Sequence, residues 1–281
     1  MNESVKEKVY TAKWLAQDFI NKNKRSSLVS SITILEAALS QYDKTSNLII
    51  TETEPERLDI TPVLTPVAIP SIMPKPINVL DVDVNWQSKG KYLTPSGKPM
   101  GLVVHYTVSG RTDIHARNVC KYFEGTPKSL GYQVACPIMD ESGNIYKSKK
   151  WSLLSDRNNH AGKSSWAGMT DLSSKFMGIE ICNWGLLNSK SRAYVLEGDI
   201  RKVLKKDNIL NDGDYEAYTQ KQELALVNLC IYLKKNCPDF TFDNVVGHDE
   251  IAPNRKTDPG GSLSITMPAF RKKLELIYAN I

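Results

Sequence analysis

The sequence contains no apolar run long enough to cross a membrane. A membrane-spanning helix needs about 18 or more consecutive apolar residues, and the 281-residue chain has no such run. The first residues, which include Glu3, Lys6 and Lys8, also lack the apolar core of a secretory signal. From the sequence we therefore expect a protein without a membrane span that is made in a cytoplasm.

Cysteine is scarce, and its spacing indicates no cross-link. The five cysteines are odd in number and contain no Cys-x-x-Cys pair: Cys120, Cys136, Cys182, Cys230 and Cys237. This pattern indicates neither a disulfide framework nor a cysteine zinc knuckle. We expect these side chains to be small buried apolar groups.

A concentrated basic region is missing as well. The formal net charge is only +5, and the lysines and arginines are scattered without an interleaved aromatic stripe. The sequence therefore does not predict a nucleic-acid partner. A mild positive charge serves solubility, although it would also suit an anionic partner.

The first part of the chain divides into two predicted regions. Residues 1–45 form a predicted helical hairpin, because apolar residues recur with a helical period in 5–20 and 28–42. Eight of the fourteen prolines lie between residues 44 and 99. Proline removes backbone donors and fixes φ, so we expect a semi-rigid extended linker over 46–90. The hairpin is too short for a large core and should serve targeting or assembly.

Residues 91–281 read as a separate α/β domain. Apolar runs predict buried strands at 102–104, 132–135, 178–182 and 245–246. Helices are predicted to begin at Thr112, at Thr219 and near Pro268, and Thr219 with Gln222 forms a capping box. Strands that alternate with helices predict a central mixed sheet covered by helices.

Histidine is rare, and two of the four histidines follow predicted strands. His105 ends the apolar run 102–104, and His248 follows Val245-Val246-Gly247. In open α/β sheets, ligands bind outside the carboxyl ends of strands, so these imidazoles can meet there. A loop returning past His248 would bring Asp258 beside it, with Lys256 on the same face of the extended chain.

Two imidazoles and one carboxylate form a set that suits catalytic zinc. Such sites leave a fourth position for water, whereas structural zinc is usually enclosed by four ligands that include thiolates. Bound zinc lowers the pKa of water to about 7. The residue pattern thus predicts a zinc hydrolase without naming its substrate.

Five segments, taken together and in this order, resemble the type 2 N-acetylmuramoyl-L-alanine amidases. That family includes phage lysins, bacterial wall-recycling amidases and peptidoglycan recognition proteins. The similarity spans roughly residues 98–275, and its last segment is the longest and most specific. The segments are Val-Val-His-Tyr-Thr at 103–107, Leu-Gly-Tyr-Gln-Val at 130–134, Asn-His-Ala-Gly at 159–162, Gly-Ile-Glu-Ile at 178–181 and Gly-His-Asp-Glu-Ile-Ala-Pro-Asn-Arg-Lys-Thr-Asp-Pro-Gly at 247–260.

The resemblance implies a role for each matching residue. It implies Zn²⁺ ligands at His105, His248 and Asp258. Glu180 resembles the general base toward the attacking water, and Lys256 resembles the donor that stabilises the oxyanion. The alternatives, which we disfavour, are that Glu180 is paired with a buried cation and that Lys256 is a solvated loop lysine.

Two further positions match the substrate groove of the family. His160 resembles a histidine that lines the groove without binding metal, and Tyr132 resembles a tyrosine near the reacting centre. Their alternatives are an ordinary loop histidine and a packed core tyrosine. His115, on a predicted helix, is expected at the surface.

The resemblance implies zinc-dependent hydrolysis of the amide bond between N-acetylmuramic acid and L-alanine in peptidoglycan. The hairpin, the spacer and the missing signal favour a phage-type lysin or a virion-associated enzyme, which acts on the cell wall after release or as part of a virion. Residues 1–45 would then contact a virion or cell-wall partner. The alternative is a cytoplasmic wall-recycling amidase.

Two other classes of protein compete with an amidase. A peptidoglycan-binding module that does not cut is disfavoured, because such relatives lack the third ligand that Asp258 supplies here. A cysteine peptidase would need Cys182 beside His248. Reactive thiolates sit near positive charge or a helix N-terminus, whereas Cys182 reads as part of a strand.

Overall fold

The computed structural model describes residues 75–89, 93–204 and 211–281. The predicted hairpin at 1–45 and the predicted linker up to residue 74 lie outside the described residues. Among the helices that are described, none has the length and apolar character that crossing a membrane requires.

A six-stranded sheet forms the centre of the described domain. In spatial order its strands are β1 (Val79–Val82), β4 (Ile145–Ser148), β3 (Ile138–Met139), β7 (Phe176–Ile181), β2 (Gly101–Tyr106) and β10 (Val245–Gly247). Neighbouring strands are parallel except for the antiparallel pair β3–β4. Because β7, β2 and β10 are parallel neighbours, their carboxyl ends meet at one edge of the sheet.

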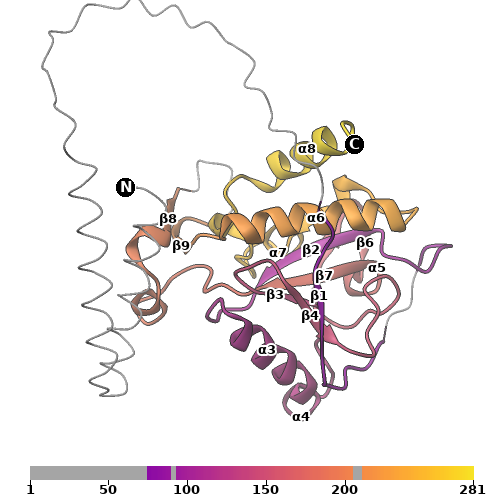
Figure 1. Cartoon of the computed structure of the whole chain (residues 1–281), viewed down its shortest axis with the longest axis horizontal. Helices are drawn as coiled ribbons and strands as arrows, with labels where there is room; N and C mark the ends of the chain where they lie inside the picture. The colour runs from indigo at the N-terminus through magenta and orange to yellow at the C-terminus, as the bar shows by residue number, and fades with distance from the viewer. Residues whose placement is uncertain (1–74, 90–92, 205–210) are drawn as a thin grey trace, which may run out of the picture. The chain divides into compact units, whose positions relative to one another are not determined.

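Helices cover both faces of the sheet (Figure 1). Helices α6 (Gln220–Asn236) and α8 (Met267–Tyr278) pack with Leu102 and Val104 in one apolar cluster. Helix α3 (Asp113–Gly125) lies on the other side and packs with Ile138 in a second cluster. Because helices cover both faces, the central strands β2 and β7 are mostly apolar and buried, and their polar residues His105 and Glu180 lie near the carboxyl ends. The predicted α/β class is confirmed.

The predicted helix starts are also confirmed. Thr219 accepts a hydrogen bond from the Gln222 backbone at 3.0 Å, and its own N–H donates to Gln222 Oε1 at 3.0 Å. This reciprocal capping satisfies two of the donors that the first turn of α6 leaves open. Helix α8 begins with Thr266 as its cap and Pro268 in its first turn.

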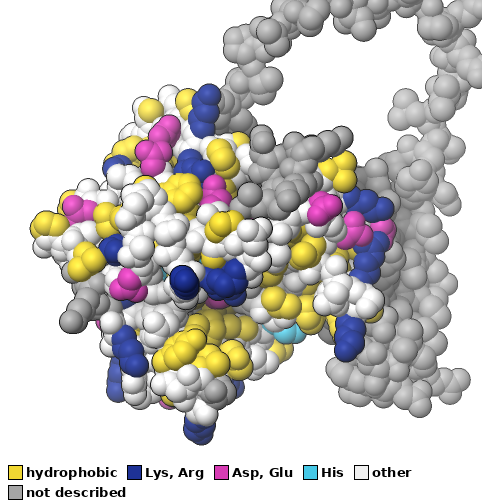
Figure 2. All heavy atoms as spheres, turned by 180° about the vertical axis from the view of Figure 1, so that it is seen from behind, with side chains coloured by type: hydrophobic (Ala, Val, Ile, Leu, Met, Phe, Trp, Pro, Cys, Tyr) yellow, Lys and Arg dark blue, Asp and Glu magenta, His cyan; other side chains and the backbone are white. Residues whose placement is uncertain are grey.

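Short elements complete the domain. They are the helices α4 (Pro127–Leu130), α5 (Leu172–Lys175) and α7 (His248–Ile251), the hairpins β5 (Ser165–Trp166) with β6 (Met169–Thr170) and β8 (Ile200–Val203) with β9 (Gly213–Glu216), and the 3-10 turns Ser191–Tyr194, Glu197–Asp199, Phe242–Asn244 and Gly260–Ser262. On the face drawn in Figure 2, the lysines and arginines are spread among apolar and acidic side chains without a continuous basic stripe.

The structure corrects two of the predicted boundaries. The predicted strand at 132–135 is wrong, since Val134 makes only an isolated bridge with Asn159. Side chains satisfy this backbone instead: the Val134 N–H donates to Thr126 Oγ1 at 2.9 Å, and the chain joins the sheet only after Pro137. The predicted linker also extends too far, because Val79–Val82 pair with β4 as an edge strand.

Candidate active site

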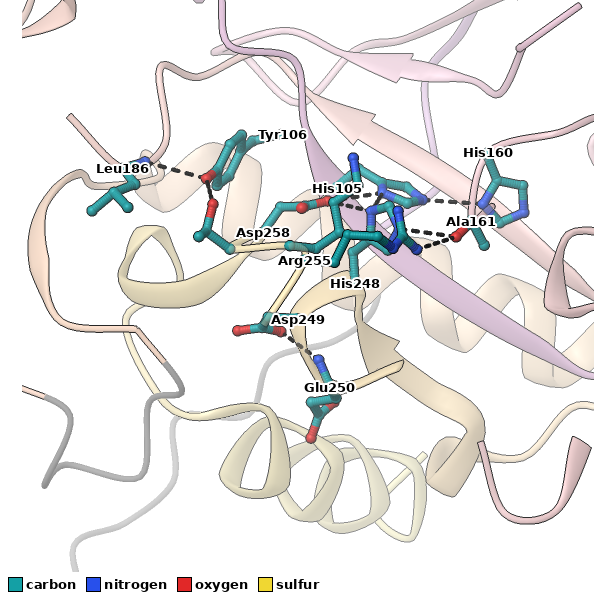
Figure 3. A network of polar contacts seen from close by, with 12 residues as sticks. His105, Tyr106, His160, Ala161, Leu186, His248, Asp249, Glu250, Arg255 and Asp258 are labelled. Atoms are coloured by element: carbon teal, nitrogen blue, oxygen red, sulfur yellow. Dashed lines mark hydrogen bonds and ion pairs between the residues drawn. The ribbon is translucent and has the colours of Figure 1, made fainter. Parts of the chain in front are cut away.

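Three predicted residues meet at the carboxyl ends of adjacent strands (Figure 3). His105 lies in β2, His248 begins α7 directly after β10, and Asp258 follows the next loop. His105 Nδ1, His248 Nδ1 and Asp258 Oδ2 are each 2.9 Å from the other two. All three side chains are buried. The structure therefore brings together the three residues predicted as metal ligands.

The backbone around α7 explains how Asp258 reaches His248. The Asp249 N–H donates to the Asp258 carbonyl at 2.8 Å, which fastens the returning loop to the helix. Gly247 makes this approach possible, since a Cβ there would lie 2.3 Å from Asp249 Oδ1 and 2.7 Å from Pro259 Cδ. Any larger residue at position 247 would push the loop away from the two imidazoles.

The hydrogen-bond network assigns the protons of the histidines. His160 Nε2 faces the Phe176 carbonyl at 3.1 Å and must donate to it, which leaves His160 Nδ1 as an acceptor. His105 Nε2 then donates to His160 Nδ1 at 3.1 Å. Burial, together with the neighbouring His248, lowers the pKa of His105 to about 4, so this ring is neutral near pH 7. Its Nδ1 consequently carries a lone pair.

The same reasoning applies to His248. Its Nε2 lies 3.1 Å from the Ala161 carbonyl and donates to it, which leaves Nδ1 as the ring nitrogen that faces His105 and Asp258. Burial would raise the pKa of Asp258, but the facing imidazoles outweigh it and lower that pKa, so the carboxylate is ionised. The two Nδ1 atoms and Asp258 Oδ2 thus converge as three buried ligand atoms. Such a group calls for a cation, and its donor types fit a catalytic zinc site.

Glu180 lies beside this cluster. It is the register partner of His105 across β7 and β2. Its Oε2 is buried and has no hydrogen-bond partner among the described residues. Burial raises the pKa of Glu180 well above its usual value, the charge of Asp258 raises it further, and Lys256 opposes them. Within the described residues no cation forms an ion pair with Glu180, which argues against the purely structural alternative.

A cavity of about 840 Å³ opens over the cluster. All seven predicted site residues line it: His105, Tyr132, His160, Glu180, His248, Lys256 and Asp258. Tyr132 is 48% exposed, so it is not a packed core residue. Lys256 lies near enough to His105 and Glu180 to affect the pKa of each.

Other lining residues were not singled out from the sequence. Tyr106 follows His105, and its hydroxyl contacts Thr257 Oγ1 and accepts from the Leu186 N–H at 3.4 Å. Trp184 and Leu186 also line the cavity, just beyond the end of β7. The available signal was that Trp184 and Leu186 closely follow the Gly-Ile-Glu-Ile segment. The local sequence does not show whether the loop after this segment turns toward the site or away from it.

His160 lies in the cavity and Cys182 is buried, as the sequence led us to expect. His160 lines the cavity, as the resemblance implied, but it also accepts the hydrogen bond that orients His105. Cys182 lies just beyond the end of β7 and is fully buried in an apolar cluster with Cys120. Burial raises the pKa of the Cys182 thiol, which makes it a poor nucleophile.

Comparisons with known proteins match this part of the chain. The sequence profile of a family described as N-acetylmuramoyl-L-alanine amidase matches residues 95–261. The 1,6-anhydro-N-acetylmuramyl-L-alanine amidase AmpD of Haemophilus influenzae is 26% identical over 169 residues, which cover 57% of this chain and 74% of AmpD.

Two solved structures are also similar to this chain. AmpDh3 from Pseudomonas aeruginosa, in complex with anhydromuramic pentapeptide, is 26% identical, has a TM-score of 0.40, and covers 70% of this chain and 66% of its own. AmiD from E. coli, in complex with anhydro-N-acetylmuramic acid-L-Ala-D-gamma-Glu-L-Lys, is 24% identical, has a TM-score of 0.40, and covers 63% of this chain and 57% of its own.

Proposed function

This chain belongs to the N-acetylmuramoyl-L-alanine amidase family, and from that membership we propose that it uses zinc to hydrolyse the amide bond between N-acetylmuramic acid and L-alanine in peptidoglycan. One observation carries the zinc part of the proposal. Two imidazole Nδ1 atoms and a carboxylate oxygen, all buried, lie 2.9 Å from one another beneath an open cavity.

His105, His248 and Asp258 would hold the ion. Bound zinc supplies a Lewis acid that polarises the scissile carbonyl and makes the attacking water more acidic. The protein contributes the arrangement of the donors: His160 fixes the orientation of His105, and the Ala161 carbonyl fixes that of His248. Outer partners of this kind hold ligands ready before the metal arrives.

Glu180 is the proposed general base. Its Oε2 lacks a partner among the described residues, so it is free to accept a proton from water. Burial raises the pKa of Glu180, and a carboxylate with a raised pKa is a stronger base that can accept a proton and later return it to the leaving nitrogen. An ordinary solvent-exposed glutamate would be too weak a base for this exchange.

Lys256 is the proposed oxyanion donor. Its ammonium has no ion-pair partner within residues 75–89, 93–204 and 211–281. It lines the cavity, so it can donate to the negative charge that develops on the carbonyl oxygen. Tyr132 lines the same cavity and is placed to contact the substrate.

Digestion of purified sacculi by the full-length protein tests the reaction. We expect mass analysis to find free stem peptides that begin with L-alanine beside intact glycan strands. A chelator should stop release and added Zn²⁺ should restore it. Glu180→Gln should slow release strongly, whereas Glu275→Gln, at an exposed position of α8, should not. Cleaved glycosidic bonds, or cleavage within the stem peptide, would refute the proposed substrate bond.

The biological setting has two candidates. The predicted hairpin and spacer favour a lysin or a virion-associated enzyme, and residues 1–74 of this region lie outside the described part of the chain. The relative from H. influenzae is named for an anhydro muropeptide, which favours the recycling alternative. The ratio of turnover on sacculi to turnover on soluble 1,6-anhydro-muropeptide separates the two: a lysin should prefer sacculi, and a recycling enzyme the soluble substrate.

A further inference from the structure

An aromatic pair at the cavity rim has no part in the proposed hydrolysis. Trp184 lines the cavity, and its ring stacks on Tyr194 with centroids 5.2 Å apart and planes at 16°. Tyr194 lies at the end of the turn Ser191–Tyr194 and is 73% exposed, more than any other large apolar side chain in the described residues. The pair thus extends the cavity wall outward into solvent.

Buried polar contacts hold this wall in place. The backbone N–H of Trp184 donates to Glu216 Oε2 at 2.6 Å, and Glu216 in β9 is only 2% exposed. Arg111 pairs with Glu216 at 3.2 Å and with Asp199 at 2.7 Å. The backbone that carries Trp184 is therefore held in place before any ligand arrives, which lowers the entropy cost of binding.

The cavity differs in charge between its two ends. Figure 3 shows Tyr106 and Leu186 on one side of His105, with His160 and Ala161 on the other. Arg255 donates to the carbonyls of Ala161 and Lys163 at 3.1 and 2.7 Å, so its guanidinium lies at the second end. In the described part of the chain, no carboxylate pairs with it.

Among the described residues, no arginine lines the cavity at the end with Leu186 and Trp184. Arg111 is paired as described above, and Arg192 pairs with Asp214 at 2.6 Å and with Glu197 at 2.7 Å. A ligand that carries free carboxylates is therefore attracted to the Arg255 end. An uncharged ligand with an apolar face suits the aromatic end.

The substrate of the proposed reaction has these two parts. Its stem peptide carries carboxylates, whereas its glycan strand presents N-acetylhexosamine rings with apolar C–H faces. We propose that the Trp184–Tyr194 pair binds an N-acetylhexosamine ring of the glycan strand, beyond the muramic acid that carries the scissile amide. The inference rests on the proposed function for its choice of ligand. Tyrosine and tryptophan suit this task because they offer a large, rigid contact face at low entropy cost.

Binding of an uncharged N-acetylglucosamine tetrasaccharide to the full-length protein tests the site. Calorimetry should show that Tyr194→Ala weakens binding by ~10-fold, as loss of one stacked aromatic contact implies. Tyr194→Phe keeps the ring face and should bind like the wild type. Tyr122→Ala removes a tyrosine that is 65% exposed on α3 and does not line the cavity, so it should have no effect.

A kinetic comparison supplies a second measurement. Tyr194→Ala should raise the KM for glycan strands more than the KM for a monosaccharide muropeptide, because only the strands reach the aromatic pair. Equal increases for both substrates would argue against a separate saccharide site.

The binding result is independent of the proposed hydrolysis. The tetrasaccharide contains no bond that an amidase cuts, and the titration can be repeated with a chelator present. A protein that binds the sugar but cuts no muropeptide refutes the proposed function alone. Unchanged affinity in Tyr194→Ala, or equal losses in Tyr194→Ala and Tyr194→Phe, refutes the saccharide site and leaves a protein segment as the occupant of the rim.

Discussion

The metal-ligand cluster and the Trp184–Tyr194 pair belong to one cavity but are built in opposite ways. His105, His248 and Asp258 are buried, and the carboxyl ends of packed strands fix their positions. Tyr194 is exposed and stands on a segment that ion pairs fasten to the domain. We infer from this contrast that the strand ends of the sheet position the catalytic residues, whereas a peripheral segment determines which substrate binds. If so, changes in one region should leave the other intact.

Asp258→Asn should produce the largest effect on the buried region. The amide replaces the only ionised ligand, so zinc affinity should fall by more than the ~10–100-fold that loss of an outer partner costs. Metal analysis after dialysis and kcat/KM on muropeptide measure this loss. Asp243→Asn, at an exposed position, is the matched control. Tetrasaccharide affinity should survive in Asp258→Asn; its loss would contradict the separation of the two regions.

Lys256→Ala should separate catalysis from metal binding within the cavity. Removal of an oxyanion donor typically costs ~10²–10³-fold in kcat, and the three ligands remain. Lys121→Ala, at an exposed position of α3, should retain full activity. If Lys256→Ala lost its zinc, Lys256 would support the fold of the ligand loop instead of acting on the substrate.

His160→Ala tests how the buried region holds its ligands. Without the acceptor for His105 Nε2, the imidazole can rotate and change its tautomer, so zinc affinity should fall by ~10–100-fold. Competition with a chromophoric chelator measures this affinity. His115→Ala is the matched control, since His115 is exposed and bonds to Thr112. Equal affinity in both variants would show that β2 alone orients His105.

Glu216→Ala should have the smallest effect, and this effect should be confined to the exposed region around Trp184 and Tyr194. Removing this buried acceptor leaves the Trp184 backbone N–H without a partner and Arg111 paired with Asp199 alone, at a cost of ~1–3 kcal/mol in the free energy of unfolding. Urea denaturation measures the change. Glu197→Ala breaks an exposed pair and should cost no more than ~1 kcal/mol. Reduced zinc affinity in Glu216→Ala would show that the two regions are coupled.

Local sequence patterns predicted the features that depend only on residues close together in the chain. The capping box of Thr219 with Gln222 depends on residues three apart, and the apolar runs that end at His105 and His248 are contiguous. The apolar run at 132–135 led to a wrong strand prediction, because a short apolar segment can occur in a strand or in a buried loop. Here the Val134 N–H donates to Thr126 instead of to a neighbouring strand. Edge strand β1 was missed because nearby prolines dominated the pattern.

Hydrophobic periodicity, helix capping and residue chemistry are properties of short segments. The α/β pattern and the residues that can bind a metal could therefore be predicted from the sequence. Three other features depend on the tertiary structure. His160 orients His105, Glu180 has an oxygen without a partner among the described residues, and the Trp184 backbone N–H donates to Glu216. These contacts join residues far apart in the chain. They exist only once the sheet and its loops have packed, so no local pattern specifies them.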